Sequence, residues 1–124
     1  MKRVLYVGQD PDTVDFSDPS LPPGTDAVKI KAGIERAAQA LSARGWRADL
    51  CMISPDDAGI AMLMRMLDAT DYDCAVIGGG LRMPPKTVPL FERVVNAIIA
   101  ASPRTRLAFN TGPDDTADAA ARWL

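Results

Sequence analysis

A short apolar run at residues 74–77 is followed directly by three consecutive glycines, Gly78, Gly79 and Gly80. Small and β-branched residues without polar alternation are typical of a strand that is buried on both faces, as in a parallel sheet. Ligands of open parallel sheets bind beyond the carboxyl ends of the strands. The stretch therefore predicts both a fold class and the place of a binding site. We also expect at least one of the three glycines to adopt a positive φ.

Strand-like and helix-like segments alternate four times along the chain, with no internal repeat. The predicted strands cover residues 3–7, 50–53, 74–77 and 106–110, and each is followed by a segment with helical spacing of apolar residues. Right-handed crossovers place such helices on both faces of a parallel sheet. We therefore predict one α/β domain over residues 1–124, a three-layer α/β/α sandwich with a doubly wound four-stranded sheet in the order 2-1-3-4.

Several residues indicate where the helices begin and end. Gly45 is expected at the C′ position of the first helix, and Ser54 is expected as the N-cap of the second, with Pro55 at N1. The third helix is predicted from about residue 87 to 101. Its side chains expected to face the core are Phe91, Val94, Val95 and Ile98.

The predicted strand order brings two loops together where the winding of the sheet reverses, between the first and third strands. These are residues 9–24, the only long irregular segment, and residues 78–85. Backbone amides of the glycine turn and the guanidinium of Arg82 are suited to an anion. We accordingly expect a small anionic ligand there, and the candidate ligand-binding residues are Gly78, Gly79, Gly80, Arg82, Asn110 and Thr111.

The first loop carries four aspartates, at positions 10, 12, 15 and 18. Because they repel one another, we expect them to be balanced by a cation of the third-strand turn, either Arg82 or Lys86. The loop is therefore predicted to close over that turn.

Composition argues against several other classes of protein. The net charge is −2 and the arginines are dispersed, which gives no reason to expect nucleic acid. No apolar run is long enough to span a membrane, no signal peptide is evident, and a cytoplasmic location is expected. Cys51 and Cys74 lie in apolar runs and are expected to be buried thiols. No G-x-G-x-x-G follows the first strand, so no cofactor is expected.

Residues 10–14, Asp-Pro-Asp-Thr-Val, resemble the D-x-D-x-T/V signature of haloacid-dehalogenase-type phosphotransferases. The resemblance implies a nucleophile at Asp10, a general acid/base at Asp12, and a Mg²⁺ site. The further positions in the expected linear order are Ser54, Lys86, Asp114 and Asp115. The chain departs from that pattern because Gly8 and Gln9 separate Asp10 from the strand. A Mg²⁺-dependent phosphohydrolase is thus an alternative to a binding module.

The second half of the chain, at residues 90–97 and 107–111, resembles small uncharacterised bacterial proteins of this length. The resemblance implies a flavodoxin-like or receiver-like fold and carries no activity with it. Receiver domains need a phosphoaccepting aspartate at the end of the third strand, where this chain has glycines.

Three functional hypotheses follow. The first is a non-catalytic module that binds a small anionic ligand or a protein partner beyond strands one and three. The second is the phosphohydrolase, and the third is a structural subunit. The predicted edge strand at residues 106–110 has no central charge or proline, and the last helix carries Ala117, Ala120 and Ala121. We therefore expect a homodimer through the edge strand or that helix.

Overall fold

The computed structural model describes all of residues 1–124 and contains one parallel sheet. Its strands are β1 (Arg3–Gln9), β2 (Arg47–Ile53), β3 (Cys74–Ile77) and β4 (Arg106–Phe109). They pair in the order β2-β1-β3-β4, all in parallel, as the sequence predicts. β1 and β2 are longer than expected, because they stay paired from Arg3 opposite Arg47 to Gln9 opposite Ile53.

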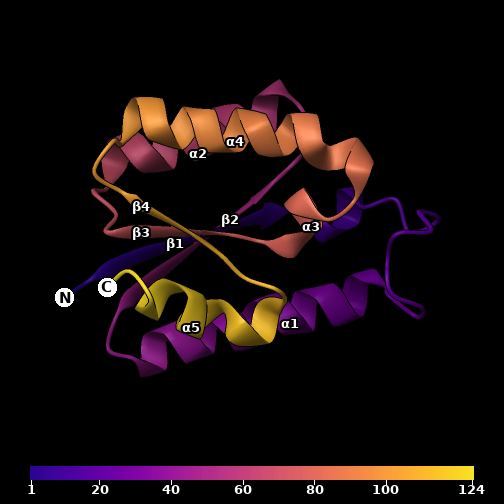
Figure 1. The fold of residues 1–124 in the computed structure, drawn as a ribbon, viewed down its shortest axis with the longest axis horizontal. Coiled ribbons are helices and arrows are strands. Elements are labelled where there is room, and N and C mark those ends of the chain that lie inside the picture. The colour runs from indigo at the N-terminus through magenta and orange to yellow at the C-terminus, as the bar shows by residue number, and fades with distance from the viewer.

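Helices cover both faces of the sheet (Figure 1). α2 (Asp57–Ala69) and α4 (Val88–Ala101) lie on one face, and α1 (Ala27–Ala43) and α5 (Thr116–Ala121) lie on the other. The remaining elements are short: α3 (Gly79–Arg82) and the 3₁₀ turns η1 (Pro11–Thr13), η2 (Pro85–Thr87) and η3 (Pro113–Asp115). This arrangement is the predicted three-layer α/β/α sandwich. None of the helices combines the length and the apolar character that crossing a membrane requires.

Side chains alternate between the two faces of each strand and form two separate cores. The first core, between the sheet and α2 with α4, includes Leu5, Val7 and Cys51. The second core, between the sheet and α1 with α5, includes Val4 and Cys74. Both cysteines are free thiols with less than 2 % of their surface exposed, as expected.

The helix ends show one confirmed prediction and one error. Gly45 follows the C-cap of α1 with φ +81°, in the left-handed region where glycine is favoured. The N-cap of α2, however, is Asp56 and not Ser54. The Asp56 carboxylate accepts a hydrogen bond from Gly59 N at 3.0 Å, while the Ser54 hydroxyl donates to that carboxylate at 2.6 Å. Ser54 thus supports the cap instead of supplying it.

The prediction of a positive φ in the glycine turn is wrong. Gly78 has φ −68°, and the glycines with positive φ are Gly24 and Gly45. Gly79 and Gly80 instead open the helical turn α3, a conformation that any residue adopts. Close approach explains only Gly78, where a Cβ would lie 3.3 Å from the carbonyl oxygen of Val7.

The helix faces also differ from expectation at the β4 side of the molecule. Val94 and Ile98 are buried as predicted, but Phe91 and Val95 are only half-buried. In α5, the alanines at 117, 119 and 120 are buried in the second core, so they are not available to a partner. Ala121 alone of the predicted alanine face is exposed.

Candidate functional site

A cavity of about 540 Å³ lies beyond the carboxyl ends of β1 and β3, at the predicted point of reversal. One wall is residues 10–25, which we call the strap, and the opposite wall is residues 78–87. The volume falls in the range of small-molecule sites. Its apolar lining comes from Val14, Leu21, Ile30, Ile34, Met52 and Met83, and its polar lining includes Tyr6, Gln9, Thr13 and Thr111.

The strap is shaped by local hydrogen bonds from its own aspartates. Asp10 caps η1 by accepting from Asp12 N at 3.0 Å. Asp15 accepts from the backbone N–H and hydroxyl of Ser17, and Asp18 accepts in the same way from Ser20. Such Asx turns give a polar segment a defined path without a helix or strand.

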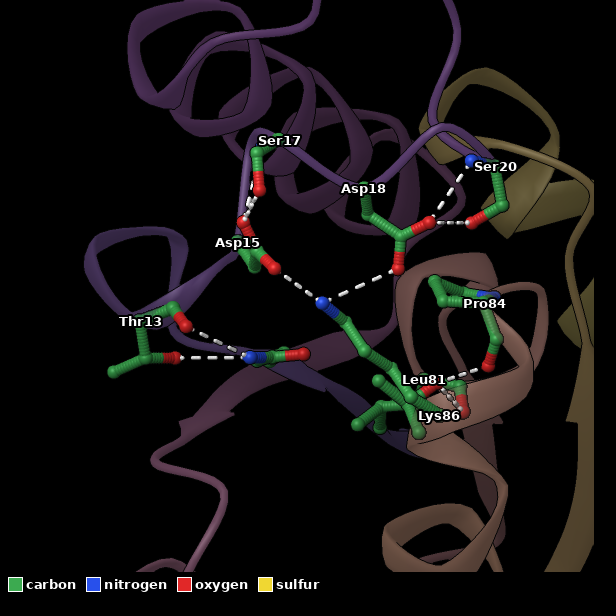
Figure 2. Close-up of polar contacts among 10 residues, drawn as sticks. Thr13, Asp15, Ser17, Asp18, Ser20, Leu81, Pro84 and Lys86 are labelled. Carbon is green, nitrogen blue, oxygen red and sulfur yellow. Dashed lines mark hydrogen bonds and ion pairs between the residues drawn. The ribbon is translucent and has the colours of Figure 1, made fainter.

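Lys86 joins the strap to the opposite wall (Figure 2). Its Nζ donates to the carboxylate of Asp15 and lies 3.3 Å from Oδ2 of Asp18. The hydrogen bonds from Lys86 and Ser17 lower the pKa of Asp15 to about 2. Asp15 in turn raises the pKa of Lys86, and the hydrogen bonds from Ser20 lower the pKa of Asp18. The predicted closure of the loop is confirmed, with Lys86 as its cation.

Further contacts hold each wall in place. The side-chain amide of Gln9 donates to the backbone carbonyl and hydroxyl of Thr13, both at 3.2 Å. Asp12 pairs with Lys31 of α1 at 3.0 Å. On the opposite wall, the hydroxyl of Thr87 donates to the carbonyls of Leu81 and Pro84, both at 2.9 Å (Figure 2). Each wall of the cavity is therefore held by its own hydrogen bonds, and Lys86 joins the two walls.

Asn110 lies below the cavity at the end of β4 and is 1 % exposed. Its Oδ1 accepts from Gly79 N at 3.0 Å, and its Nδ2 donates to the hydroxyls of Thr116 and Tyr6 at 3.0 and 3.3 Å. Burial raises the pKa of Tyr6, a shift that the hydrogen bond from Asn110 partly offsets. Asn110 thus fixes the start of α3 and the Tyr6 ring.

Arg82 does not line the cavity. Its Nη2 donates to the carbonyl oxygen of Asn110, and its guanidinium lies over the ring of Phe109, 5.6 Å from the centroid. Its Nε is buried without a hydrogen-bond partner. Of the six candidate ligand-binding residues, Gly78, Gly79, Gly80 and Thr111 line the cavity, whereas Arg82 and Asn110 do not.

The acidic residues of the phosphohydrolase hypothesis have separate partners. Asp114 pairs with Arg36 at 3.0 Å, and Asp115 accepts from the backbone and hydroxyl of Thr111. Asp10 and Asp12 are engaged within the strap and with Lys31. No three acidic or other metal-ligating side chains come together in the structure. The geometry gives this hypothesis no Mg²⁺ site.

Sequence reasoning missed most of the apolar lining of the cavity. Val14 and Leu21 were a usable signal, because they are large apolar residues in a loop rich in aspartate and serine, although the same signal also marks Phe16, which does not line the cavity. Ile30 and Ile34 lie in the first half of α1, the half nearest the carboxyl ends of the strands. Their helical spacing predicts ordinary core positions, and only the path of the strap shows that they line a cavity.

The charged groups of the cavity are engaged with one another. Its lysine and its aspartates form ion pairs across the two walls, and neither cysteine lines it. Burial also raises the pKa of Cys51 and of Cys74 to about 11, so both thiols stay protonated. Comparison of the sequence with protein-family models and with curated proteins gives no match.

Proposed function

We propose that this protein is a non-catalytic module that binds a small, largely apolar molecule with one acidic group in the cavity under the strap. The observation that carries the proposal is the cavity itself, with a largely apolar lining, a position at the reversal of the sheet, and one ion-paired lysine that joins its two walls. Sites for small organic molecules combine an apolar body with a few placed polar groups in this way.

The acidic group is assigned to Lys86, because it is the one cationic side chain of the lining. In the structure Lys86 is held by Asp15 and Asp18. A ligand carboxylate, sulfonate or phosphate must therefore displace the half-exposed Asp15 carboxylate from Lys86, which leaves Asp15 with its hydrogen bonds from Ser17. This role differs from the predicted one, in which Arg82 and glycine amides hold the anion.

Two naphthalene probes of matched shape test the proposal. 8-Anilinonaphthalene-1-sulfonate carries an acidic group, and N-phenyl-1-naphthylamine has the same aromatic body without it. We expect both to bind with one-to-one stoichiometry in fluorescence titrations. Lys86→Met should weaken binding of the sulfonate about fivefold more than binding of the neutral probe, because only the sulfonate loses a charged contact, whereas a looser strap affects both probes alike.

Two tryptophan substitutions on α1 locate the binding. Ile30→Trp fills the cavity and should abolish binding of both probes. Val28→Trp is the matched control, since Val28 is 77 % exposed on the same helix and does not line the cavity. The proposal is wrong if neither probe binds, or if Ile30→Trp binds as well as the control. Binding of the neutral probe alone would refute only the acidic group.

A further inference from the structure

β4 is an edge strand with unpaired backbone groups. Arg106 N donates to Asp73 O at 3.0 Å, which places the backbone groups of Arg106 and Ala108 toward β3. In a parallel ladder alternate residues turn the other way, so the groups of Leu107 and Phe109 face outward. Of these, only the carbonyl of Phe109 has a partner within the chain, Nη2 of Arg122 at 2.9 Å.

The structure leaves this edge without the usual protection. Exposed edges are normally interrupted by lysine, proline or a bulge, or covered by another element. Here the strand reads Arg-Leu-Ala-Phe, and α5 packs on the face of the sheet through its buried alanines. Figure 1 shows β4 passing between α4 above and α5 below, with neither laid along its edge.

An apolar stripe on α4 continues the edge. Val88, Phe91, Val95 and Ile99 are spaced by three or four residues and so share one side of the helix. Val88 and Ile99 are 40 % and 53 % exposed. The ring of Phe91 meets that of Phe109 edge-on, with centroids 6.0 Å apart. We define the β4–α4 face as this stripe together with Leu107 and Phe109.

We propose that the β4–α4 face binds a second copy of this chain through antiparallel pairing of the two β4 strands about a two-fold axis. With Ala108 on the axis, Leu107 of each copy lies opposite Phe109 of the other. These two residues carry the outward backbone groups, so each such pair can exchange two hydrogen bonds. The pairing turns two four-stranded sheets into one of eight strands.

The same two-fold axis also brings the apolar stripes of the two α4 helices into contact. The two α4 helices run antiparallel, which brings Val88 at the start of one near Ile99 toward the end of the other. Leu107 and Phe109 of opposite copies meet on the same face of the joined sheet, where apolar cross-strand pairs are stabilising. An identical copy is favoured as the occupant because a single patch supplies both halves of every one of these contacts.

The size of the β4–α4 face predicts a weak dimer. α4 has 14 residues, about 21 Å of helix, and one helix layer with the sheet is about 15 Å deep. The projected face is about 300 Å², below the roughly 600–1,000 Å² that specific interfaces bury per partner. We therefore expect a dissociation constant of about 100 μM.

Arg122 is expected to oppose this assembly. Its side chain donates a hydrogen bond to the Phe109 carbonyl, which the pairing needs, so Arg122 must be displaced when the dimer forms.

None of the six residues of the β4–α4 face lines the cavity, so assembly and ligand binding use separate surfaces. Failure of one proposal leaves the other standing.

Sedimentation velocity from about 1 μM to 1 mM tests the proposal. The wild type should pass from a 13.3 kDa monomer to twice that mass. Phe109→Lys places a charge opposite Leu107 of the other copy and should raise the dissociation constant about tenfold or more. Ile99→Lys should also weaken the dimer, and its exposed position protects the fold. Val28→Lys, with the same change of charge on the opposite layer, should dimerise like wild type, and Arg122→Ala should dimerise more tightly.

Amide hydrogen exchange distinguishes strand pairing from helix packing alone. The amides of Leu107 and Phe109 should become protected as the concentration rises, while those of the strap should not change. The proposal is overturned by a monomer throughout the concentration range. It is also overturned by a dimer that Phe109→Lys and Ile99→Lys leave intact, or in which these two amides stay unprotected.

Discussion

Two glycines show that the same residue type serves opposite purposes in this chain. Gly59, in the first turn of α2, is buried, and a Cβ there would overlap the carbonyl oxygen of Ser54. Gly80, in α3, has a negative φ and open space where its Cβ would be. Gly59 is therefore required for steric reasons, whereas Gly80 has no steric role and only raises the conformational entropy of the unfolded chain.

Alanine at these two positions should therefore have opposite effects. Gly59→Ala should lower the free energy of unfolding by about 2–3 kcal/mol, because the overlap is with rigid backbone. Gly80→Ala should raise it by about 0.4–1 kcal/mol through the reduced entropy of the unfolded state. Urea unfolding followed by circular dichroism measures both. Equal stabilities of the two variants would contradict this assignment.

Asn110 is the buried polar residue on which the edge of the cavity depends. Asn110→Ala leaves Gly79 N–H and the hydroxyls of Tyr6 and Thr116 without this partner. We expect a loss of about 2–3 kcal/mol in the free energy of unfolding, since buried unsatisfied groups are costly. Asn96→Ala is the control, because Asn96 is exposed on α4. A loss no larger than that of the control would show that Asn110 is dispensable.

At this scale the sequence identified positions better than roles. Gly78 to Gly80 and Thr111 do line the cavity. Arg82 was expected at a ligand because an arginine near glycine amides suits an anion. Its alternative partners, the Asn110 carbonyl and the Phe109 ring, lie 28 and 27 positions further along the chain. No local pattern reveals contacts of that separation.

The strap is the element whose stability is most open to change. One lysine and two aspartates at the surface connect it to the opposite wall, and exposed ion pairs contribute little to stability. The pKa of Asp15 is lowered to about 2, so its contribution is complete above the pKa of free Asp, about 3.9, and is lost as the pH falls through about 2. The raised pKa of Lys86 keeps its contribution complete below about pH 10.4.

Lys86→Met should loosen the strap while leaving the sheet unchanged. Amide exchange at Ser17 and Ser20 should accelerate about two- to fivefold, and about 1 M salt should move the wild type in the same direction. Lys2→Met, an exposed change of the same charge, is the control. Strap amides that exchange alike in wild type and Lys86→Met would show that the Asx turns alone hold the segment.

The fold of the strap could be predicted only in part. The repulsion of its aspartates and the nearness of Lys86 in the expected topology were enough to predict closure. The cavity beneath it was not predictable, because Val14 and Leu21 share its lining with Met52 and Met83, which lie more than 30 positions further along the chain. The error at Ser54 has a local cause: two good capping residues lie two positions apart, and only their geometry shows that Asp56 takes the position.

The whole molecule follows closely from the alternation of segments. Right-handed crossovers and continuous burial of residues 74–77 leave few strand orders, and the observed order is the predicted one. The alternation of strands and helices does not determine whether the edge strand β4 is covered. Helices of a doubly wound fold cover faces, so whether β4 is protected depends on where the last helix settles, and α5 settles on the second core.

The two buried thiols fall on opposite sides of this sheet, Cys51 in the first core and Cys74 in the second. A thiol reagent can reach each one only when the layer above it separates from the strands. Because the chain has no other cysteine, the rate at which each thiol is modified reports the opening of its own layer. Comparing the two rates would therefore show, without any added label, which layer opens first.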